Sequence, residues 1–110
     1  MNVRDIVDAL PVDVLTGEER LDTSVEGGYV ADLLSCVMAG AATDNVWITL
    51  QTHANIVAVA SLLGIAAIIV AEGAPVPEET LRKAQSQDMI VLSTQEPIFE
   101  TVARLVELGV

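Results

Sequence analysis

The sequence predicts an α/β protein with three layers (α/β/α), in which helices cover both faces of a mostly parallel β-sheet. Length is one reason, because a chain of 110 residues fits a single domain over residues 1–110. Composition is another: 52% of the residues are apolar, yet only one Trp, one Tyr and one Phe occur, so the core is aliphatic. Short β-branched segments also alternate with helical ones, which implies right-handed βαβ crossovers. The pattern leaves the strand order open.

The first part of the chain contains two helices and a strand. They are an amphipathic helix over residues 3–10, a strand over residues 12–16, and a helix over residues 32–41 with Asp32 near its start. The segment between the strand and the second helix is less regular. Its Gly27-Gly28 pair marks a turn or a close approach of the backbone.

The uncharged run from Ala54 to Ala71 has nearly the length of a membrane helix. However, no Lys or Arg flanks it closely, and its character changes at Gly64. The residues before Gly64 favour a helix with Asn55 as its N-cap, and IAAIIV after it favours a buried strand. We therefore expect a helix, a glycine cap and a strand, with no membrane span.

The remaining elements continue the alternation. VWITL (residues 46–50) and MIVL (residues 89–92) are strands, and residues 77–87 form a surface helix with favourable charges in its first turn. The last helix is expected to begin with a capping box at Ser93-Thr94-Gln95-Glu96 and to end at Gly109. Its apolar stripe consists of Ile98, Val102, Leu105 and Val106.

Ligands of open parallel sheets bind beyond the carboxyl ends of the strands. Four loops are expected along that edge: residues 16–18, 51–55, 72–73 and 93–95. Together with the glycine pair, they supply the candidate ligand-binding residues Thr52, His53, Asn55, Gly27, Gly28, Glu72, Gly73, Ser93 and Thr94.

Each candidate also has a purely structural interpretation. Thr52 and His53 are placed to contact a phosphate or carboxylate at a helix N-terminus, but Asn55 can simply cap that helix while His53 packs locally. Ser93 and Thr94 can serve the capping box alone. The glycine pair is weak as a signal, and the known phosphate-loop fingerprints are absent. No set of nucleophile, base and orienting group can be assembled, so no catalytic residue is assigned.

Charge and residue counts exclude several classes of function. A net charge of −11 disfavours nucleic acids and anionic membrane surfaces as partners. With Cys36 and His53 as the only residues of their types, one chain cannot build a Cys/His zinc site, and no metal or cofactor is expected. Cys36 is interpreted as an inert core thiol. No signal peptide is visible, so the expected compartment is the cytoplasm.

Several stretches resemble the DRTGG domain family. They are GGYVADLLSCVMAGA, VWITLQTHANIVAVASLLGIAAIIVAEG, PEETLRKAQSQDMIVLST and FETVARLVELG, which together run from Gly27 to Gly109. The contiguous letters D-R-T-G-G are absent, and only Gly27 and Gly28 match the glycines of that name.

The resemblance implies an accessory module without established catalytic activity. Such domains occur beside CBS domains in regulated pyrophosphatases and in some phosphotransacetylases, where they sit at dimer interfaces. Stand-alone members are associated with iron-only hydrogenases and kinase-like proteins. The domains that accompany the family in these proteins imply an adenine nucleotide or a related regulatory ligand.

Three hypotheses for the function follow. The first is a non-catalytic regulatory or interaction module, homodimeric because so small a domain cannot cover all its aliphatic residues internally, and binding a small anionic ligand such as an adenine nucleotide. The second is an accessory subunit of a hydrogenase- or kinase-related complex. The third is a small enzyme that acts on a phosphorylated metabolite through His53.

Overall fold

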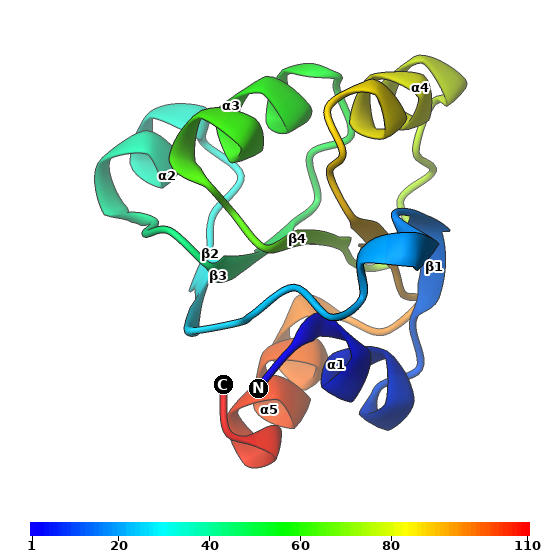
Figure 1. The fold of residues 1–110 in the computed structure, drawn as a ribbon. Coiled ribbons are helices and arrows are strands. Elements are labelled where there is room, and N and C mark those ends of the chain that lie inside the picture. The colour runs from blue at the N-terminus through cyan, green and yellow to red at the C-terminus, as the bar shows by residue number, and fades with distance from the viewer.

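A five-stranded sheet lies between two layers of helices (Figure 1) in a computed structural model that describes residues 1–110. The strand order is β1-β5-β4-β3-β2, where the strands are β1 (Asp13–Thr16), β2 (Gly27–Val30), β3 (Asn45–Thr49), β4 (Ala67–Val70) and β5 (Val91–Ser93). β2, β3, β4 and β5 pair in parallel, and β1 pairs antiparallel with β5. The predicted three-layer α/β/α fold with a mostly parallel sheet is confirmed.

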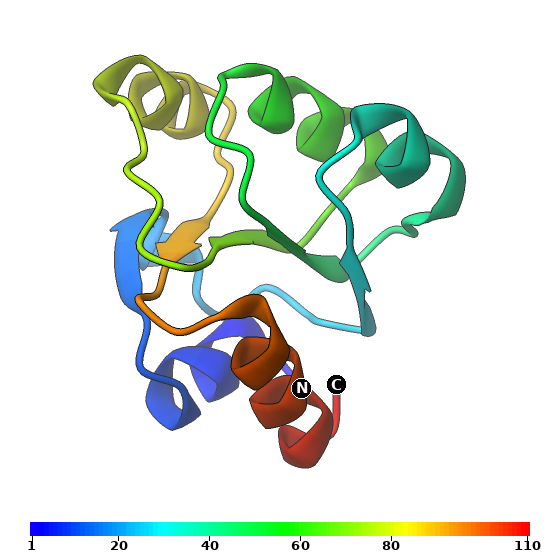
Figure 2. The same ribbon diagram turned by 180° about the vertical axis from the view of Figure 1, so that it is seen from behind.

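The helices divide between the two faces of the sheet, as Figures 1 and 2 show from opposite sides. One face carries α2 (Leu34–Gly40), α3 (Asn55–Leu63) and α4 (Glu78–Ser86), and the other carries α1 (Val3–Ala9) and α5 (Ile98–Leu108). A short 3₁₀ turn, η1, covers Glu18–Arg20. The longest helix, α5, has 11 residues, and none of the helices has the length and hydropathy that a bilayer crossing needs.

The core forms two aliphatic clusters, one on each face of the sheet. All four residues of β4 are buried, because this central strand is covered on both sides. Ile68 packs toward α2, α3 and α4, while its neighbour Ile69 packs toward α1 and α5. Trp47 of β3 is fully buried in the first cluster, and its indole N–H donates to the carbonyl of Ala31 at 2.9 Å. Burial of each such side chain contributes about 1.5–3 kcal/mol to the free energy of folding, because apolar surface is removed from water.

The long apolar run folds as expected, with the helix α3 followed by the buried strand β4. Gly64 ends α3 in the left-handed conformation (φ 71°), and its N–H donates to the carbonyls of Ala60 and Ser61. Only glycine adopts this conformation without steric cost, which is why the run divides at this position.

Several sequence-based expectations are wrong in detail. Residues 27–30 form the strand β2 inside the segment that looked irregular. Cys36 is exposed and is no core thiol, because α2 presents only Val37 as a buried side chain. Within the predicted apolar stripe of the last helix, Leu105 is buried but Val106 is 65% exposed.

Candidate functional site

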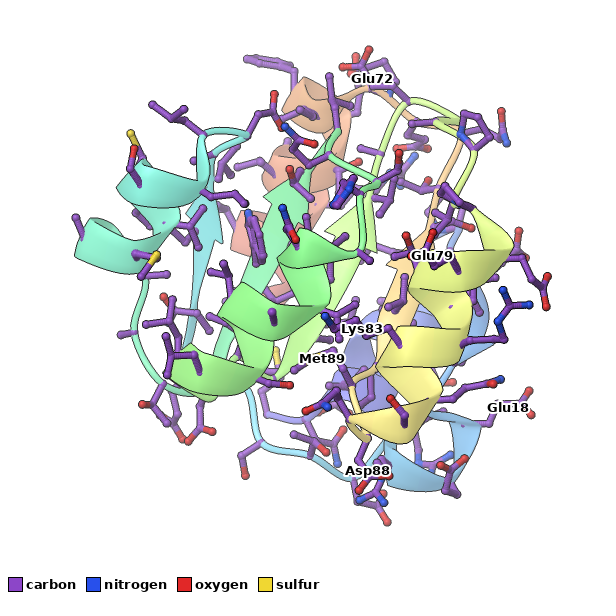
Figure 3. The ribbon with its side chains drawn as sticks, turned by 90° about the horizontal axis from the view of Figure 1, so that it is seen from above. Glu18, Glu72, Glu79, Lys83, Asp88 and Met89 are labelled. Carbon is purple, nitrogen blue, oxygen red and sulfur yellow. The ribbon has the colours of Figure 1, made fainter.

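The carboxyl ends of four parallel strands form one edge of the sheet. In spatial order the loops are residues 94–96 after β5, 71–73 after β4, 50–54 after β3 and 31–32 after β2. The loop after β1 does not join them, because β1 runs antiparallel and delivers residues 17–18 to the opposite edge. Figure 3 shows this separation, with Glu72 and Glu18 at opposite ends of the molecule. The prediction that four loops including residues 16–18 share this edge is therefore wrong.

Gly27 and Gly28 also lie away from this edge. They begin β2, opposite Asn45 and Val46 at the start of the parallel strand β3. The structure therefore separates the glycine pair from the other seven candidate residues, which lie at or just after the ends of β3, β4 and β5.

The loop after β3 is held by Asp32, which was not among the predicted site residues. One carboxylate oxygen of Asp32, Oδ1, accepts from Thr49 Oγ1 at 2.8 Å and from the Leu50 N–H at 2.7 Å. Asp32 precedes α2, which begins at Leu34, and so does not lie in its first turn. The only sequence signal was its position directly after an unrecognised strand.

His53, rather than Asn55, caps α3. Nδ1 of His53 accepts a hydrogen bond from the Asn55 N–H at 3.0 Å, and Asn55 is the first residue of the helix. The predicted Asn55 cap is therefore wrong, since the helix starts at Asn55 itself, one residue earlier than a cap at that position requires. The N–H groups of Thr52, His53 and Ala54 have no partner within the chain, so they remain free to donate.

The loop after β3 is also fixed to α4. Thr80, buried in the first turn of α4, donates from Oγ1 to the Thr52 carbonyl at 2.7 Å. This bond brings the N-terminal ends of α3 and α4 to the same edge. Thr52 is thus positioned through its backbone carbonyl rather than by its own side chain.

Glu72 and Gly73 form a tight turn after β4, with φ of 60° and 67°. Their N–H groups donate to the carbonyls of Glu96 and Thr94, both at 2.9 Å. Glu72 Oε2 accepts from the Ile98 N–H at 3.2 Å, so this carboxylate caps α5. A Cβ on Gly73 would stand 2.6 Å from Gln95 Oε1, which shows how closely that side chain covers the turn.

The predicted capping box at residues 93–96 is wrong. Thr94 Oγ1 donates to the Pro11 carbonyl at 3.0 Å and accepts from the Glu96 N–H at 3.2 Å. The chain turns once more after these residues, so α5 begins at Ile98 with Pro97 in the cap position. Glu96 points elsewhere and binds Arg104 through two hydrogen bonds of 2.7 Å.

A recess of about 270 Å³ opens at this edge, between the β4–α4 loop, β1 and β5. Two of the candidate residues, Gly73 and Ser93, line it. The full lining is Leu15, Gly73, Ala74, Pro75, Val76, Leu81, Ser93 and Gln95. Thr52, His53 and Asn55 lie outside this lining, at the next strand end.

The donors of the edge are neutral. None of the five Lys and Arg residues lines the recess, and three of them are held in ion pairs elsewhere: Arg4 with Asp22, Arg20 with Asp88, and Arg104 with Glu96. No group of three or more His, Cys, Asp or Glu side chains is placed to hold a metal ion. The recess can therefore recognise a polar ligand through hydroxyl, amide and backbone groups.

Both the sequence and the fold of this chain are similar to DRTGG domains. The sequence model of the DRTGG domain matches residues 5–108. A similar fold occurs in the crystal structure of the CBS and DRTGG domains of the regulatory region of Clostridium perfringens pyrophosphatase, complexed with the activator diadenosine tetraphosphate (TM-score 0.77, 20% identity). That match covers 96% of this chain and 46% of the other, so this chain spans less than half of its length. No curated protein matches the sequence.

Proposed function

Because this chain belongs to the DRTGG domain family, we propose that it is a non-catalytic regulatory module. In this proposal residues 1–110 act as one homodimeric unit that binds an adenine nucleotide or another small anionic ligand at the carboxyl edge of its parallel strands. The unit works in the cytoplasm, where the exposed thiol of Cys36 stays reduced.

The observation that carries the ligand proposal is the recess beside Gly73 and Ser93. It lies where open parallel sheets bind ligands. Beside it, the free N–H groups of residues 52–54 can donate to a polar group of the ligand. Since the recess has no basic side chain, we expect these neutral donors, and not an ion pair, to hold the ligand.

The choice of nucleotide rests on the solved relative. That regulatory region was crystallised with diadenosine tetraphosphate, named there as its activator. Its similarity to this chain concerns the fold, so the nucleotide is a first candidate here and the recess is where we propose it binds.

The geometry of His53 favours a binding module over an enzyme. Nδ1 of the imidazole accepts from the helix N–H of Asn55, so this nitrogen already has a structural role. A second proposal is a protein partner, such as a hydrogenase- or kinase-related subunit. The net charge of −11 supports a partner with a basic surface.

The ligand proposal is tested by thermal unfolding with AMP, ADP, ATP, diadenosine tetraphosphate and acetyl phosphate. A ligand at one hundred times its dissociation constant stabilises the fold by about 2.7 kcal/mol. In a domain of this size this raises Tm by about ten degrees or more.

The Gln95→Ala and Ser93→Ala variants should lose most of that rise, because both side chains line the recess. Gln87→Ala is the matched control, since Gln87 is exposed after the far end of α4. A rise that survives in both recess variants would place the ligand elsewhere. No rise with any compound would contradict the ligand part of the proposal.

A further inference from the structure

Helix α5 has two apolar faces. Thr101 and Leu105 are buried against the sheet. Phe99 and Val106 lie on another side, where they are 81% and 65% exposed, and the exposed Ala103 lies between them. The positions 99, 103 and 106 recur at helical spacing, so they form a continuous stripe. A surface helix that packs on one side only has no need of this second stripe.

The stripe continues onto the edge strand β2. A hollow of about 220 Å³ separates α5 from β2, and its lining consists of Gly28, Tyr29, Val30, Ile48, Val102, Leu105, Val106 and Val110. A second hollow of about 570 Å³ runs along α5, and its lining consists of Ile98, Phe99, Val102, Ala103, Val106 and Glu107. We call this surface the α5–β2 face: Gly28, Val30, Phe99, Val102, Ala103, Val106 and Val110. β2 lies at the edge of the sheet (Figure 2), so its outer side has no neighbouring strand to pair with.

The α5–β2 face has no charged residue in a chain whose net charge is −11. One charged residue of α5, Glu107, lines the second hollow and lies at the rim of this face. Arg104 is directed to Glu96, and the hydrogen bonds that its guanidinium donates to that carboxylate, together with the negative charge of Glu96, raise the pKa of the guanidinium. Contact surfaces between proteins are depleted of charge at their centre in the same way.

We propose that the α5–β2 face is the contact between two copies of this chain, an inference that rests on the proposed homodimer. In this dimer the two α5 helices cross antiparallel at Ala103 on a twofold axis. Phe99 of one copy then packs against Val106 of the other, and the small side chain of Ala103 lets the helices approach closely.

Charge identifies a second copy as the occupant. Two molecules of −11 repel each other at every acidic surface, and this uncharged face is where they can meet with the least repulsion. A basic or acidic partner would find no complementary charge here. A stable dimer buries about 800 Å² on each partner, roughly one seventh of the 5487 Å² surface of this chain. The stripe on α5 and the open edge of β2 together offer a broad surface for this contact.

The mass in solution tests the contact. The wild type should sediment at twice the 11.6 kDa of the chain at tens of micromolar. Phe99→Glu and Val106→Glu should each raise the dissociation constant of the dimer by about 30-fold or more, because a charge is buried at the centre of the contact. Leu62→Glu is the matched control: Leu62 is 72% exposed on α3, in the opposite layer, and this variant should remain dimeric.

A cross-link tests the geometry without disrupting the fold. In a Cys36→Ser background, Ala103→Cys should form a disulfide between chains on mild oxidation, and Leu62→Cys should not. Absence of this cross-link would overturn the antiparallel crossing. A wild-type dimer that persists in both glutamate variants would overturn the assignment of this face and leave the proposed homodimer standing. A monomeric wild type would overturn both, whatever the nucleotide titrations show.

Discussion

Glu72 joins the carboxyl edge of the sheet to the helix layer below it. Its backbone N–H donates to the Glu96 carbonyl, while its carboxylate caps the N-terminus of α5 at Ile98. It does so from a left-handed conformation (φ 60°), which costs a side-chain-bearing residue about 1–2 kcal/mol. The cap offsets part of this strain, since a capping side chain contributes about 0.5–2 kcal/mol. The capping contact, and not the backbone preference of glutamate, therefore supports Glu72 in its left-handed conformation.

Replacement by glycine separates the two effects at this residue. Asp88 is a matched site, because it is also acidic, exposed and left-handed (φ 57°), but it makes only a surface ion pair with Arg20. Asp88→Gly should change the free energy of unfolding by no more than about 1 kcal/mol, since relief of strain offsets the lost ion pair. Glu72→Gly should be less stable than Asp88→Gly by about 1 kcal/mol, because it also loses the cap. Urea denaturation measures both, and equal stabilities would show that the Glu72 cap contributes nothing.

The helices and strands of the core were predictable because the residues within each segment determine its secondary structure. The β-branched run of β4 and the glycine at position 64 gave the helix–strand pair without any tertiary information. β2 was missed, because Gly27 and Gly28 conceal the strand pattern and the strand forms by pairing with β3. The direction of β1 depends on how α1 and β5 are placed, which no local pattern records. At the site, the ends of β3, β4 and β5 were predicted, but the end of β2 was missed and the end of β1 was placed at the wrong edge. Asp32 and the cap from Glu72 act between segments that are distant in sequence, so no local pattern predicts them.

The attachment of α4 to the β3 loop can be tested with an isosteric change. Thr80→Val removes the hydroxyl that donates to the Thr52 carbonyl, which has no other partner within the chain. We expect a loss of about 1–2 kcal/mol in the free energy of unfolding, because an acceptor is left without its bond.

Thr101→Val is the control for this change, since its acceptor, the Pro97 carbonyl, also accepts from the Thr101 N–H. It should therefore cost less than Thr80→Val. Thr80→Val should also lower the affinity for any ligand that binds the loop of residues 52–54. Titration calorimetry would measure this change. Similar losses in the two variants would contradict a special role for the α4 contact.

Charge is distributed unevenly over the whole molecule. The chain has sixteen acidic residues against five Lys and Arg, yet both the recess at the carboxyl edge and the α5–β2 face lack a basic side chain. The two surfaces lie at different places, one at the end of the strands and one beside the edge strand β2. Ligand binding and self-association can thus occur on the same molecule without competing for one surface.

Salt dependence of the dimer distinguishes an apolar contact from an ionic one. Two copies with a charge of −11 repel over about 30 Å at 0.01 M salt and over about 10 Å at 0.1 M. Raising the salt concentration should therefore lower the dissociation constant of the dimer, as sedimentation at several concentrations would show. For a dimer held by ion pairs, the dissociation constant would instead rise with the salt concentration. Glu107→Gln, at the rim of the contact, should reduce this dependence slightly.

The two ends of the described chain meet in the layer formed by α1 and α5 (Figure 1). The carbonyl of Met1 accepts from the Val25 N–H, and the Met1 side chain reaches Gly109, where a Cβ would stand 3.6 Å from its Cε. A unit whose ends leave from one spot can be spliced into a surface loop of a host protein, since the host needs to open its own backbone only by a small gap. The closeness of the two ends therefore suits this fold to insertion within a larger chain, with its sheet and helices unchanged.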